Sequence, residues 1–245
     1  MTMIEYGKQN NDTVMLLHGG GLSWWNYRKV AQLLAEDYHV ILPILDGHAG
    51  SDTGFTTIEQ NAERIIEYID TNFCGHITAL GGLSLGGQVA LEILTQRPDI
   101  CRFALIESAS VKPSRLTCAL IAPSVSMSYG LIKQRWFAKL QASYLGIPQE
   151  LFENYYRDTC EITRTNMIAF LKANSIYPLK PALANTTAEV KIIAGAREQK
   201  SILESAKLLH STIPGSQLEI LPSMRHGDLS INQPERHVQI LKSLF

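Results

Sequence analysis

The chain has 245 residues, a length that predicts one large domain or two small ones. Apolar residues make up 45% of it and charged residues 18%, and 22 lysines and arginines nearly balance 23 aspartates and glutamates. This composition is typical of a globular protein with a sizeable core. The formal net charge of −1 argues against a nucleic-acid-binding domain, which usually carries a basic surplus.

Cysteine usage and apolar runs indicate the compartment. The four cysteines (Cys74, Cys101, Cys118 and Cys160) are scattered and include no C-x-x-C pair, so we expect neither a disulfide scaffold nor a zinc ribbon. The first residues lack the basic start and long apolar stretch of a signal peptide, and no apolar run approaches the roughly 18 residues of a membrane span. We therefore expect a cytoplasmic protein with reduced thiols and no membrane-spanning segment.

Short apolar runs alternate along the chain with longer stretches of helical periodicity. Runs of four to six residues closed by glycine or proline predict buried parallel strands, at 14–17, 40–45, 76–80, 103–106, 190–194 and 218–221. Apolar residues at helical spacing predict helices, at 27–36, 57–72, 88–96 and 203–209. This alternation predicts β-α-β units, and hence an α/β protein whose mostly parallel sheet has helices on both faces.

The alternation breaks between residues 112 and 188. Helical or irregular segments at 126–144, 149–160 and 161–175 replace it, and five prolines punctuate the stretch. Strand-helix alternation then resumes. We interpret residues 112–188 as a helical cap inserted between two strands of a single domain that comprises residues 1–245.

One short motif carries chemistry. Residues 82–86 (Gly-Leu-Ser-Leu-Gly) fit G-x-S-x-G, with a predicted strand before them and a predicted helix beginning near Gly87. A nucleophile at such a strand-turn-helix corner needs small neighbours, because the tight turn packs Gly82 against Gly86. The helix N-terminus behind Ser84 points backbone N–H groups at any anion formed there. The alternative is a glycine-rich turn with an incidental serine.

Four segments in a fixed order resemble motifs of the α/β-hydrolase superfamily. They are the oxyanion loop LLHGGGLSWW (16–25), the loop DGHAGSD (46–52), the nucleophile elbow GGLSLGGQVA (81–90), and the histidine segment MRHG (224–227) followed by NQPE (232–235). The loop at 46–52 is one residue shorter than the family's usual D-x-x-G-x-G-x-S-D spacing. The resemblance implies an α/β-hydrolase fold with a helical cap, and an esterase-like or lipase-like serine hydrolase.

The resemblance also implies a catalytic triad. Ser84 is the expected nucleophile, and a serine needs a base to remove its proton. His226 is the expected base, since it alone of the seven histidines lies in a loop after the last predicted strand. Two carboxylates compete to orient it: Glu198, which stands where the family usually has Asp, and Glu107, at the end of the strand predicted at 103–106. We favour Glu198.

Acyl transfer creates an oxyanion that needs two preorganised N–H donors. By resemblance these are Leu85, which follows the nucleophile, and Gly20 in the H-G-G-G loop. Gly21 and Trp24 are the expected substrate-binding residues. Trp25 is equally suited to line the acyl pocket or to pack in the core. Apolar and aromatic side chains of the cap (Met127, Tyr129, Trp136, Phe137, Tyr144, Phe152, Tyr155 and Tyr156) indicate an apolar pocket or packing among the cap helices.

Absent motifs narrow the chemistry further. The chain has no G-x-x-x-x-G-K-[ST], no H-E-x-x-H and no G-x-G-x-x-G after the first predicted strand, so we expect no nucleotide, metal or organic cofactor. Haloalkane- and epoxide-hydrolysing relatives have Asp at the elbow, whereas Ser84 points to acyl chemistry. We therefore expect hydrolysis of a carboxylic ester or similar acyl bond in a small, apolar substrate; the oligomeric state is left open.

Two other functions remain open on the same fold. The segment 105–110 (Leu-Ile-Glu-Ser-Ala-Ser) is similar to one in the menaquinone-pathway synthase, a relative that performs an elimination with the same triad. That relative usually has Arg directly after the elbow's Gly-Gly, where this chain has Gln88. The second alternative is a non-catalytic ligand receptor that retains the triad.

Overall fold

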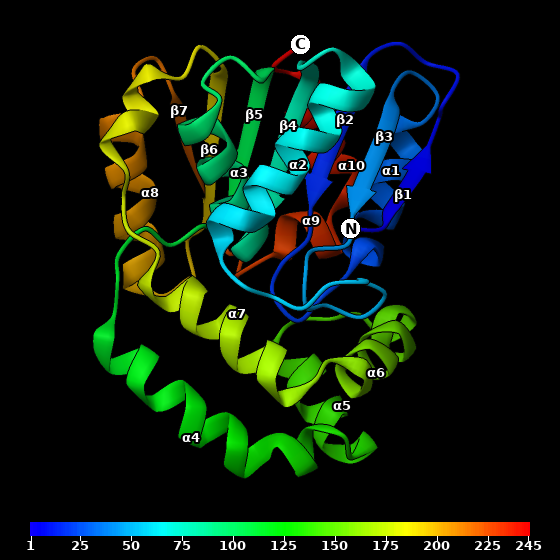
Figure 1. The fold of residues 1–245 in the computed structure, drawn as a ribbon, viewed down its shortest axis with the longest axis vertical. Helices are drawn as coiled ribbons and strands as arrows, with labels where there is room; N and C mark the ends of the chain where they lie inside the picture. Colours follow the sequence, from blue (N-terminus) through cyan, green and yellow to red (C-terminus); the bar gives the residue numbers. More distant parts are fainter.

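A seven-stranded sheet forms the centre of the computed structural model, which describes residues 1–245 (Figure 1). The strands are β1 (Met3–Tyr6), β2 (Thr13–Leu17), β3 (His39–Pro43), β4 (Ile77–Leu83), β5 (Cys101–Glu107), β6 (Glu189–Gly195) and β7 (Gln217–Leu221). Their order across the sheet is β1-β3-β2-β4-β5-β6-β7. Only β1 is antiparallel to its neighbour. The predicted mostly parallel sheet is confirmed.

Strand β1 is the one strand that the apolar pattern missed. Its sequence, Met-Ile-Glu-Tyr, is only half buried, and it pairs with β3 at the edge of the sheet. Partial burial at this edge gives β1 a weaker apolar pattern than that of the five strands with neighbours on both sides; the opposite edge strand, β7, was predicted at 218–221.

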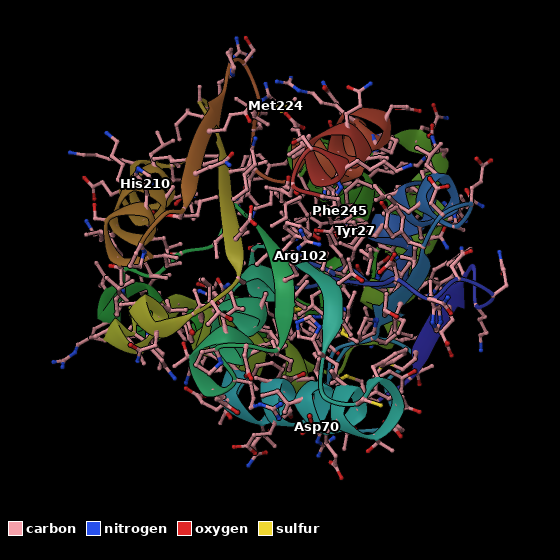
Figure 2. The ribbon with its side chains drawn as sticks, turned by 90° about the horizontal axis from the view of Figure 1, so that it is seen from above. Tyr27, Asp70, Arg102, His210, Met224 and Phe245 are labelled. Carbon is pink, nitrogen blue, oxygen red and sulfur yellow. The ribbon has the colours of Figure 1, made fainter.

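Helices cover both faces of the sheet, as predicted. The helices of the sheet layer are η1 (Trp24–Tyr27), α1 (Arg28–Leu34), α2 (Ile58–Phe73), α3 (Leu85–Gln96), α8 (Lys200–Thr212), α9 (Asp228–Asn232) and α10 (Pro234–Lys242). In Figure 2, Asp70 of α2 lies on one side of the strands, and Tyr27 and Phe245 lie on the other.

The alternation of side chains along each strand divides the core into two parts. Met15 and Leu17 of β2 join the cluster that includes residues of α2, α3 and α8. Val14 and Leu16 join the cluster with residues of α1 and α10. Because successive side chains of a strand point to opposite faces, a continuous apolar run is what a strand covered on both sides requires.

A layer of helices between β5 and β6 occupies the range 112–188. It contains α4 (Arg115–Ile132), α5 (Arg135–Tyr144), η2 (Gln149–Leu151), α6 (Phe152–Glu161), α7 (Arg164–Ile176) and η3 (Pro181–Asn185). Figure 1 shows α4 to α7 lying beyond the carboxyl ends of the strands, with α7 between α4 and the sheet. We call α4 to α7 the cap.

The helix expected at 126–144 is two helices, and the first begins eleven residues earlier. Pro123, one of the five prolines in this stretch, lies inside α4. A proline removes the hydrogen bond to the carbonyl four residues before it, here that of Ala119. Both residues are exposed, so water can hydrate that carbonyl.

By length and mean hydropathy alone, α4 meets the criteria for a membrane-crossing helix. Its 18 residues have a mean hydropathy of 1.2, and 11% of them are buried. The search for apolar runs overlooked this helix because serines, a threonine and a proline interrupt its apolar residues. Its inner face nevertheless belongs to the fold, since Val125 and Ile132 are buried there.

A buried hydrogen bond ties the cap to the sheet layer. The indole Nε1 of Trp25 donates to Asp158 Oδ2 of α6 over 2.6 Å, and both side chains are buried. Arg157 contacts the other carboxyl oxygen of Asp158, at 2.7 Å. The tryptophan thus has a polar partner as well as a packing role, as buried tryptophans usually do.

We predict that Trp25→Phe lowers the free energy of unfolding by about 2–4 kcal/mol, because the buried Asp158 carboxyl loses a donor and the smaller ring leaves a void. Urea denaturation measures this change. The control is Trp136→Phe, at an exposed position, for which we expect a change within about 0.5 kcal/mol. Equal effects of the two substitutions would contradict the role given to this hydrogen bond.

Candidate active site

Ser84 lies at a sharp turn between β4 and α3. Its backbone has φ 53° and ψ −112°, a conformation that residues with a Cβ rarely adopt. Two backbone hydrogen bonds hold this turn: Ser84 N–H donates to the carbonyl of Glu107 on β5, and Gln88 N–H donates to the carbonyl of Ser84, both over 2.9 Å. A strained serine between a strand and a helix is the geometry of a nucleophile elbow.

Two glycines make this turn possible. A Cβ at Gly82 would lie 2.3 Å from the carbonyl oxygen of Gly86, and a Cβ at Gly86 would lie 2.1 Å from the carbonyl oxygen of Leu17. Both distances are far inside van der Waals contact with backbone atoms that cannot move aside. The G-x-S-x-G spacing therefore follows from the close packing of β4, α3 and β2 around Ser84.

Ser84 opens into a cavity of about 700 Å³ between the sheet and the cap. A volume of this size is typical of a small-molecule site. Its apolar lining comes from Leu22, Leu83, Tyr144, Leu145, Ile147, Ile202 and Ile231. Its polar lining includes Ser84, Ser110, Asn174, Arg197, Glu198, Gln199, Arg225 and His226.

His226 and Glu198 come from the loops after the last two strands and meet at this cavity. Their loops pack closely together: a Cβ added at Gly195 would lie only 2.3 Å from the carbonyl oxygen of Met224. The His226 Nδ1 atom lies 2.7 Å from Glu198 Oε2. With a proton on Nδ1, the ring leaves Nε2 free to accept one.

The Glu198 carboxylate is itself held in place. Its Oε1 accepts hydrogen bonds from the Ser108 hydroxyl at 2.6 Å and from the Gly195 N–H at 2.9 Å. Burial alone would raise the pKa of Glu198, but His226, Ser108 and Gly195 together hold that pKa below its ordinary value. Glu198 is therefore an ionised, oriented partner for an imidazolium.

Glu107, the alternative partner, does not contact His226. It is buried behind the cavity, and its Oε1 accepts only the Ser230 N–H, at 3.3 Å. Burial raises the pKa of Glu107 to about 7, although Ser230 and His226 act to lower it. The structure thus brings Glu198, and not Glu107, to the histidine.

The Ser84 hydroxyl and the His226 ring line the same cavity, with no hydrogen bond between them in this structure. Contacts of this kind are often long before substrate binds and tighten in the complex. The His226 side chain is 45% exposed, so its outer edge is open to the cavity.

Gly20 and Leu85, the expected oxyanion residues, lie side by side. A Cβ at Gly20 would be 3.5 Å from the Leu85 Cβ, and Gly20 lines the cavity. Leu85 is the first residue of α3, a position whose N–H has no partner within the helix. Both residues are thus next to Ser84, where an oxyanion would form.

Gly21 and Trp24, predicted to bind substrate, do not line the cavity. Gly21 has φ +75°, and its N–H donates to Nε2 of His48 over 3.1 Å, so this donor is already used. Trp24 begins η1 and packs against the core on the α1 side of the sheet. Leu22, between them, does line the cavity, and a role of Gly21 and Trp24 in substrate binding stays a prediction.

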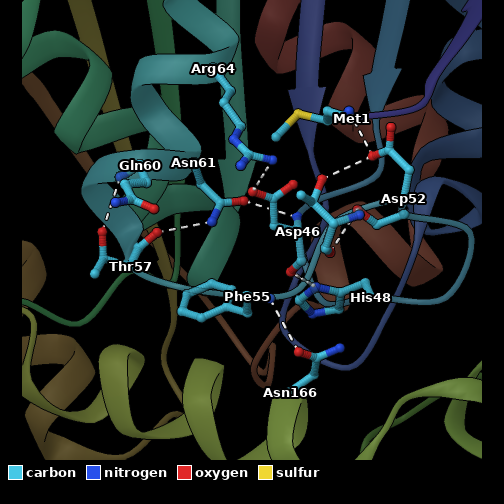
Figure 3. Close-up of polar contacts among 12 residues, drawn as sticks. Met1, Asp46, His48, Asp52, Phe55, Thr57, Gln60, Asn61, Arg64 and Asn166 are labelled. Carbon is cyan, nitrogen blue, oxygen red and sulfur yellow. Dashed lines mark hydrogen bonds and ion pairs between the residues drawn. The ribbon is translucent and has the colours of Figure 1, made fainter.

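The loop at 46–55 contacts and supports the H-G-G-G loop. Figure 3 shows polar contacts made by residues of the 46–55 loop. Nδ1 of His48 contacts the Asp46 carbonyl at 3.1 Å, which leaves Nε2 to accept from Gly21. Burial lowers the pKa of His48 to about 4, so the ring stays neutral and can act as this acceptor. Sequence reasoning noticed both loops and missed this contact between them.

Asp46 and Phe55 anchor the two ends of that loop (Figure 3). Asp46 lies 3.0 Å from Arg64, and its N–H donates to Asn61 of α2 over 2.9 Å. The Phe55 N–H donates to Asn166 of α7 over 3.2 Å, which connects the loop to the cap.

Two arginines at the cavity were missed by sequence reasoning. Arg197 and Arg225 line the cavity, and neither forms an ion pair. Each directly precedes a predicted site residue, Glu198 or His226, and this adjacency was the signal available in the sequence.

The apolar and aromatic cap residues contribute less to the cavity than the pattern indicated. Of the eight named above, only Tyr144 lines it. Phe152 and Tyr155 are buried between cap and sheet layer, whereas Met127 and Trp136 face solvent. No group of three or more His, Cys, Asp or Glu side chains is arranged to hold a metal ion.

Gln88 has a structural role at the base of the cap. It is buried, and its Nε2 donates to the carbonyls of Ser110 and Asn174 over 2.7 and 3.0 Å. Its Oε1 accepts from Nδ2 of Asn174 at 2.8 Å. The side chain that replaces the synthase's arginine is thus fully engaged in holding α7 to the sheet layer.

Comparison with known sequences agrees with this geometry. The model of a family described as the alpha/beta hydrolase family matches residues 14–239. A Gibberella zeae protein named AB hydrolase superfamily protein is 32% identical over 111 residues, which cover 44% of this chain and 39% of that protein. An uncharacterized hydrolase of Bacillus subtilis is 24% identical over 234 residues, covering 91% of this chain and 86% of its own.

Solved structures share the fold. An esterase from Exiguobacterium antarcticum matches with a TM-score of 0.83 at 20% identity, covering 98% of this chain and 93% of its own. A thermophilic esterase from Thermogutta terrifontis matches with a TM-score of 0.78 at 21% identity, covering 99% and 91%. These likenesses, together with the family match, confirm the predicted fold class.

We predict that Glu107→Gln removes a pH-dependent penalty on stability. In the folded protein Glu107 keeps its proton up to a pH of about 7, whereas in the unfolded chain it loses the proton near the ordinary glutamate pKa of 4.5. The wild type should therefore lose stability relative to the variant as pH rises from 4.5 to about 7, by on the order of 3 kcal/mol, with a constant difference above that pH.

Urea denaturation at a series of pH values measures this difference. Glu67→Gln, at an exposed position of α2, is the matched control. Parallel stability curves for wild type and Glu107→Gln across this pH range would contradict the prediction.

Proposed function

Because the chain belongs to the alpha/beta hydrolase family, we propose that it is a serine hydrolase that cleaves a carboxylic ester or a similar acyl bond. The observation that carries the proposal is the 2.7 Å contact between His226 Nδ1 and Glu198 Oε2, made at the cavity into which the strained Ser84 opens. The fold shared with two esterases supports the choice of acyl chemistry.

In this proposal Ser84 attacks the substrate carbonyl while Nε2 of His226 takes the hydroxyl proton. Glu198 keeps the ring in the tautomer with the proton on Nδ1 and stabilises the imidazolium that forms. His226 then gives the proton to the leaving group, which departs and leaves an acyl-enzyme. Water, deprotonated by the same histidine, attacks the acyl carbonyl and releases the acid and Ser84.

The oxyanion formed in both steps is stabilised by the N–H groups of Gly20 and Leu85. Two preorganised donors of this kind are worth roughly 3–4 kcal/mol each in transition-state stabilisation. The positive end of α3, which begins at Leu85, adds to their effect. The volume of the cavity suits a small-molecule substrate, and its seven apolar lining residues offer a surface for an apolar acyl group.

We expect Ser84→Ala to lower kcat/KM for short p-nitrophenyl esters by about 10⁴-fold or more, because the variant lacks the hydroxyl at the elbow that attacks the carbonyl. The variant should also lose covalent labelling by a fluorophosphonate probe. Unchanged hydrolysis in Ser84→Ala would rule out the proposed nucleophile. A wild type that binds ligands but never reacts with the probe would favour a non-catalytic receptor.

Glu198→Gln and Glu107→Gln form a matched pair that distinguishes the two candidate carboxylates. We expect Glu198→Gln to lower kcat by on the order of 10³-fold, because a neutral amide neither stabilises the imidazolium nor fixes the correct tautomer. Glu107→Gln should leave kcat near the wild-type value, since Glu107 does not contact His226. Steady-state kinetics on the same ester measures both, and the reverse order of effects would assign the role to Glu107.

A further inference from the structure

The cap carries an apolar surface that faces solvent. Its residues form one stripe on α4 and one on α5, with Leu145 directly after α5. They are Leu116 (73% exposed), Leu120 (54%), Met127 (85%), Leu131 (44%), Trp136 (63%), Leu140 (63%), Tyr144 (83%) and Leu145 (43%). We call these residues the cap stripe. Eight of the eleven large hydrophobic residues exposed on the molecule belong to it.

Helical geometry makes the cap stripe continuous along each helix. On α4 its members recur at intervals of four, seven and four residues, and on α5 at intervals of four, so each set lies on a single face. The opposite face of α4 carries Val125 and Ile132, which are buried. Thus α4 is apolar on two sides: the inner side packs on the fold, and the outer side has no partner within the chain.

The segment that carries the cap stripe has basic side chains and no acidic ones. Residues 108–149 contain five basic side chains (Lys112, Arg115, Lys133, Arg135 and Lys139) and no Asp or Glu, whereas the whole chain has a net charge of −1. Lys112 and Arg135 are paired with Glu204 and Glu153. Arg115, Lys133 and Lys139 are exposed and form no ion pair, so positive charge borders the cap stripe near both ends of α4 and within α5.

Apolar side chains bordered by unpaired cations are the pattern of a helix that lies in the interface of an anionic membrane. A second copy of the chain fits less well, because two such surfaces would bring like charges together. We propose that the cap stripe docks on the surface of an anionic lipid bilayer, with α4 and α5 lying in its headgroup region. The packing of α4 on the fold suits a helix that lies on the membrane rather than one that crosses it.

The cap stripe also reaches the mouth of the Ser84 cavity. Tyr144 and Leu145 belong to it and line the cavity as well. Docking would therefore place the opening of the cavity at the lipid surface. Docking itself does not depend on the proposed hydrolysis, so Ser84→Ala should bind membranes as the wild type does.

Vesicle flotation with the full chain tests the proposal. We expect the protein to bind phosphatidylcholine vesicles that contain about 30% phosphatidylglycerol, and to bind pure phosphatidylcholine about tenfold or more weakly. The triple variant Leu116→Ser, Leu120→Ser, Met127→Ser should lose about tenfold or more in affinity for the anionic vesicles. The matched control is Leu33→Ser with Leu208→Ser, which changes exposed leucines on α1 and α8 and should bind as the wild type does.

Charge reversal tests the second part of the argument. Arg115→Glu with Lys139→Glu should weaken binding to the anionic vesicles by about tenfold or more, since each basic residue near such a surface contributes about 1 kcal/mol. The control reverses Arg102 of β5 and Lys207 of α8, which are exposed residues of the sheet layer. Circular dichroism and urea denaturation verify that every variant is folded.

Tryptophan fluorescence reports where the protein touches the membrane. Of the three tryptophans, Trp136 is exposed in the cap stripe, Trp25 is buried and Trp24 is half-buried. Brominated lipids should quench the wild type and not Trp136→Phe. The proposal is overturned if wild type and triple variant bind vesicles equally, if quenching persists in Trp136→Phe, or if no vesicle binding occurs. A dimer that the triple variant abolishes, without vesicle binding, would assign the surface to a second copy.

Discussion

The close packing of three backbone segments around Gly82 and Gly86 is the constraint on which the position of Ser84 depends. β2, β4 and α3 approach so closely there that a Cβ on either glycine would overlap backbone atoms. The serine between them is forced into a positive φ, and its hydroxyl is directed to the cavity beyond the strand ends. The rest of the site is arranged around that fixed point: Gly20, Glu198 and His226 reach it from loops that follow parallel strands, and Tyr144 and Asn174 reach it from the cap.

Two neighbouring glutamates show how local contacts give chemically identical carboxyl groups different pKa values. Glu107 ends β5 and Glu198 follows the neighbouring β6, and both side chains are removed from water. Glu198 accepts hydrogen bonds from Ser108 and Gly195 and faces His226, so its charge is compensated and its pKa is lowered. Glu107 has a single weak donor, and burial raises its pKa to about 7. The number of donors that converge on each group, more than its depth, decides its protonation state.

The inserted helices between β5 and β6 have two different surroundings. On the inner side, Asp158, Asn166 and Asn174 connect them to the sheet layer by buried or half-buried hydrogen bonds. On the outer side, the cap stripe exposes a concentration of apolar side chains that water does not favour. The cap therefore closes the cavity on its inner side, and on its outer side it presents an apolar surface that no other part of the chain covers.

Six of the seven strands, the helices α1, α2, α3 and α8, and the strand-turn-helix position of Ser84 could be predicted from the sequence, because each depends on local periodicity and turn chemistry. The half-buried edge strand β1 and the first eleven residues of α4 escaped prediction, since an apolar pattern interrupted by polar residues fits more than one kind of element. The preference for Glu198 over Glu107 came from resemblance and left both open. Only the tertiary structure distinguishes them, and only it pairs the Gly21 N–H with His48 and brings Arg197 and Arg225 to the cavity. Such contacts join residues from different loops, and their distances are set by how the strands pack and not by any pattern along the chain.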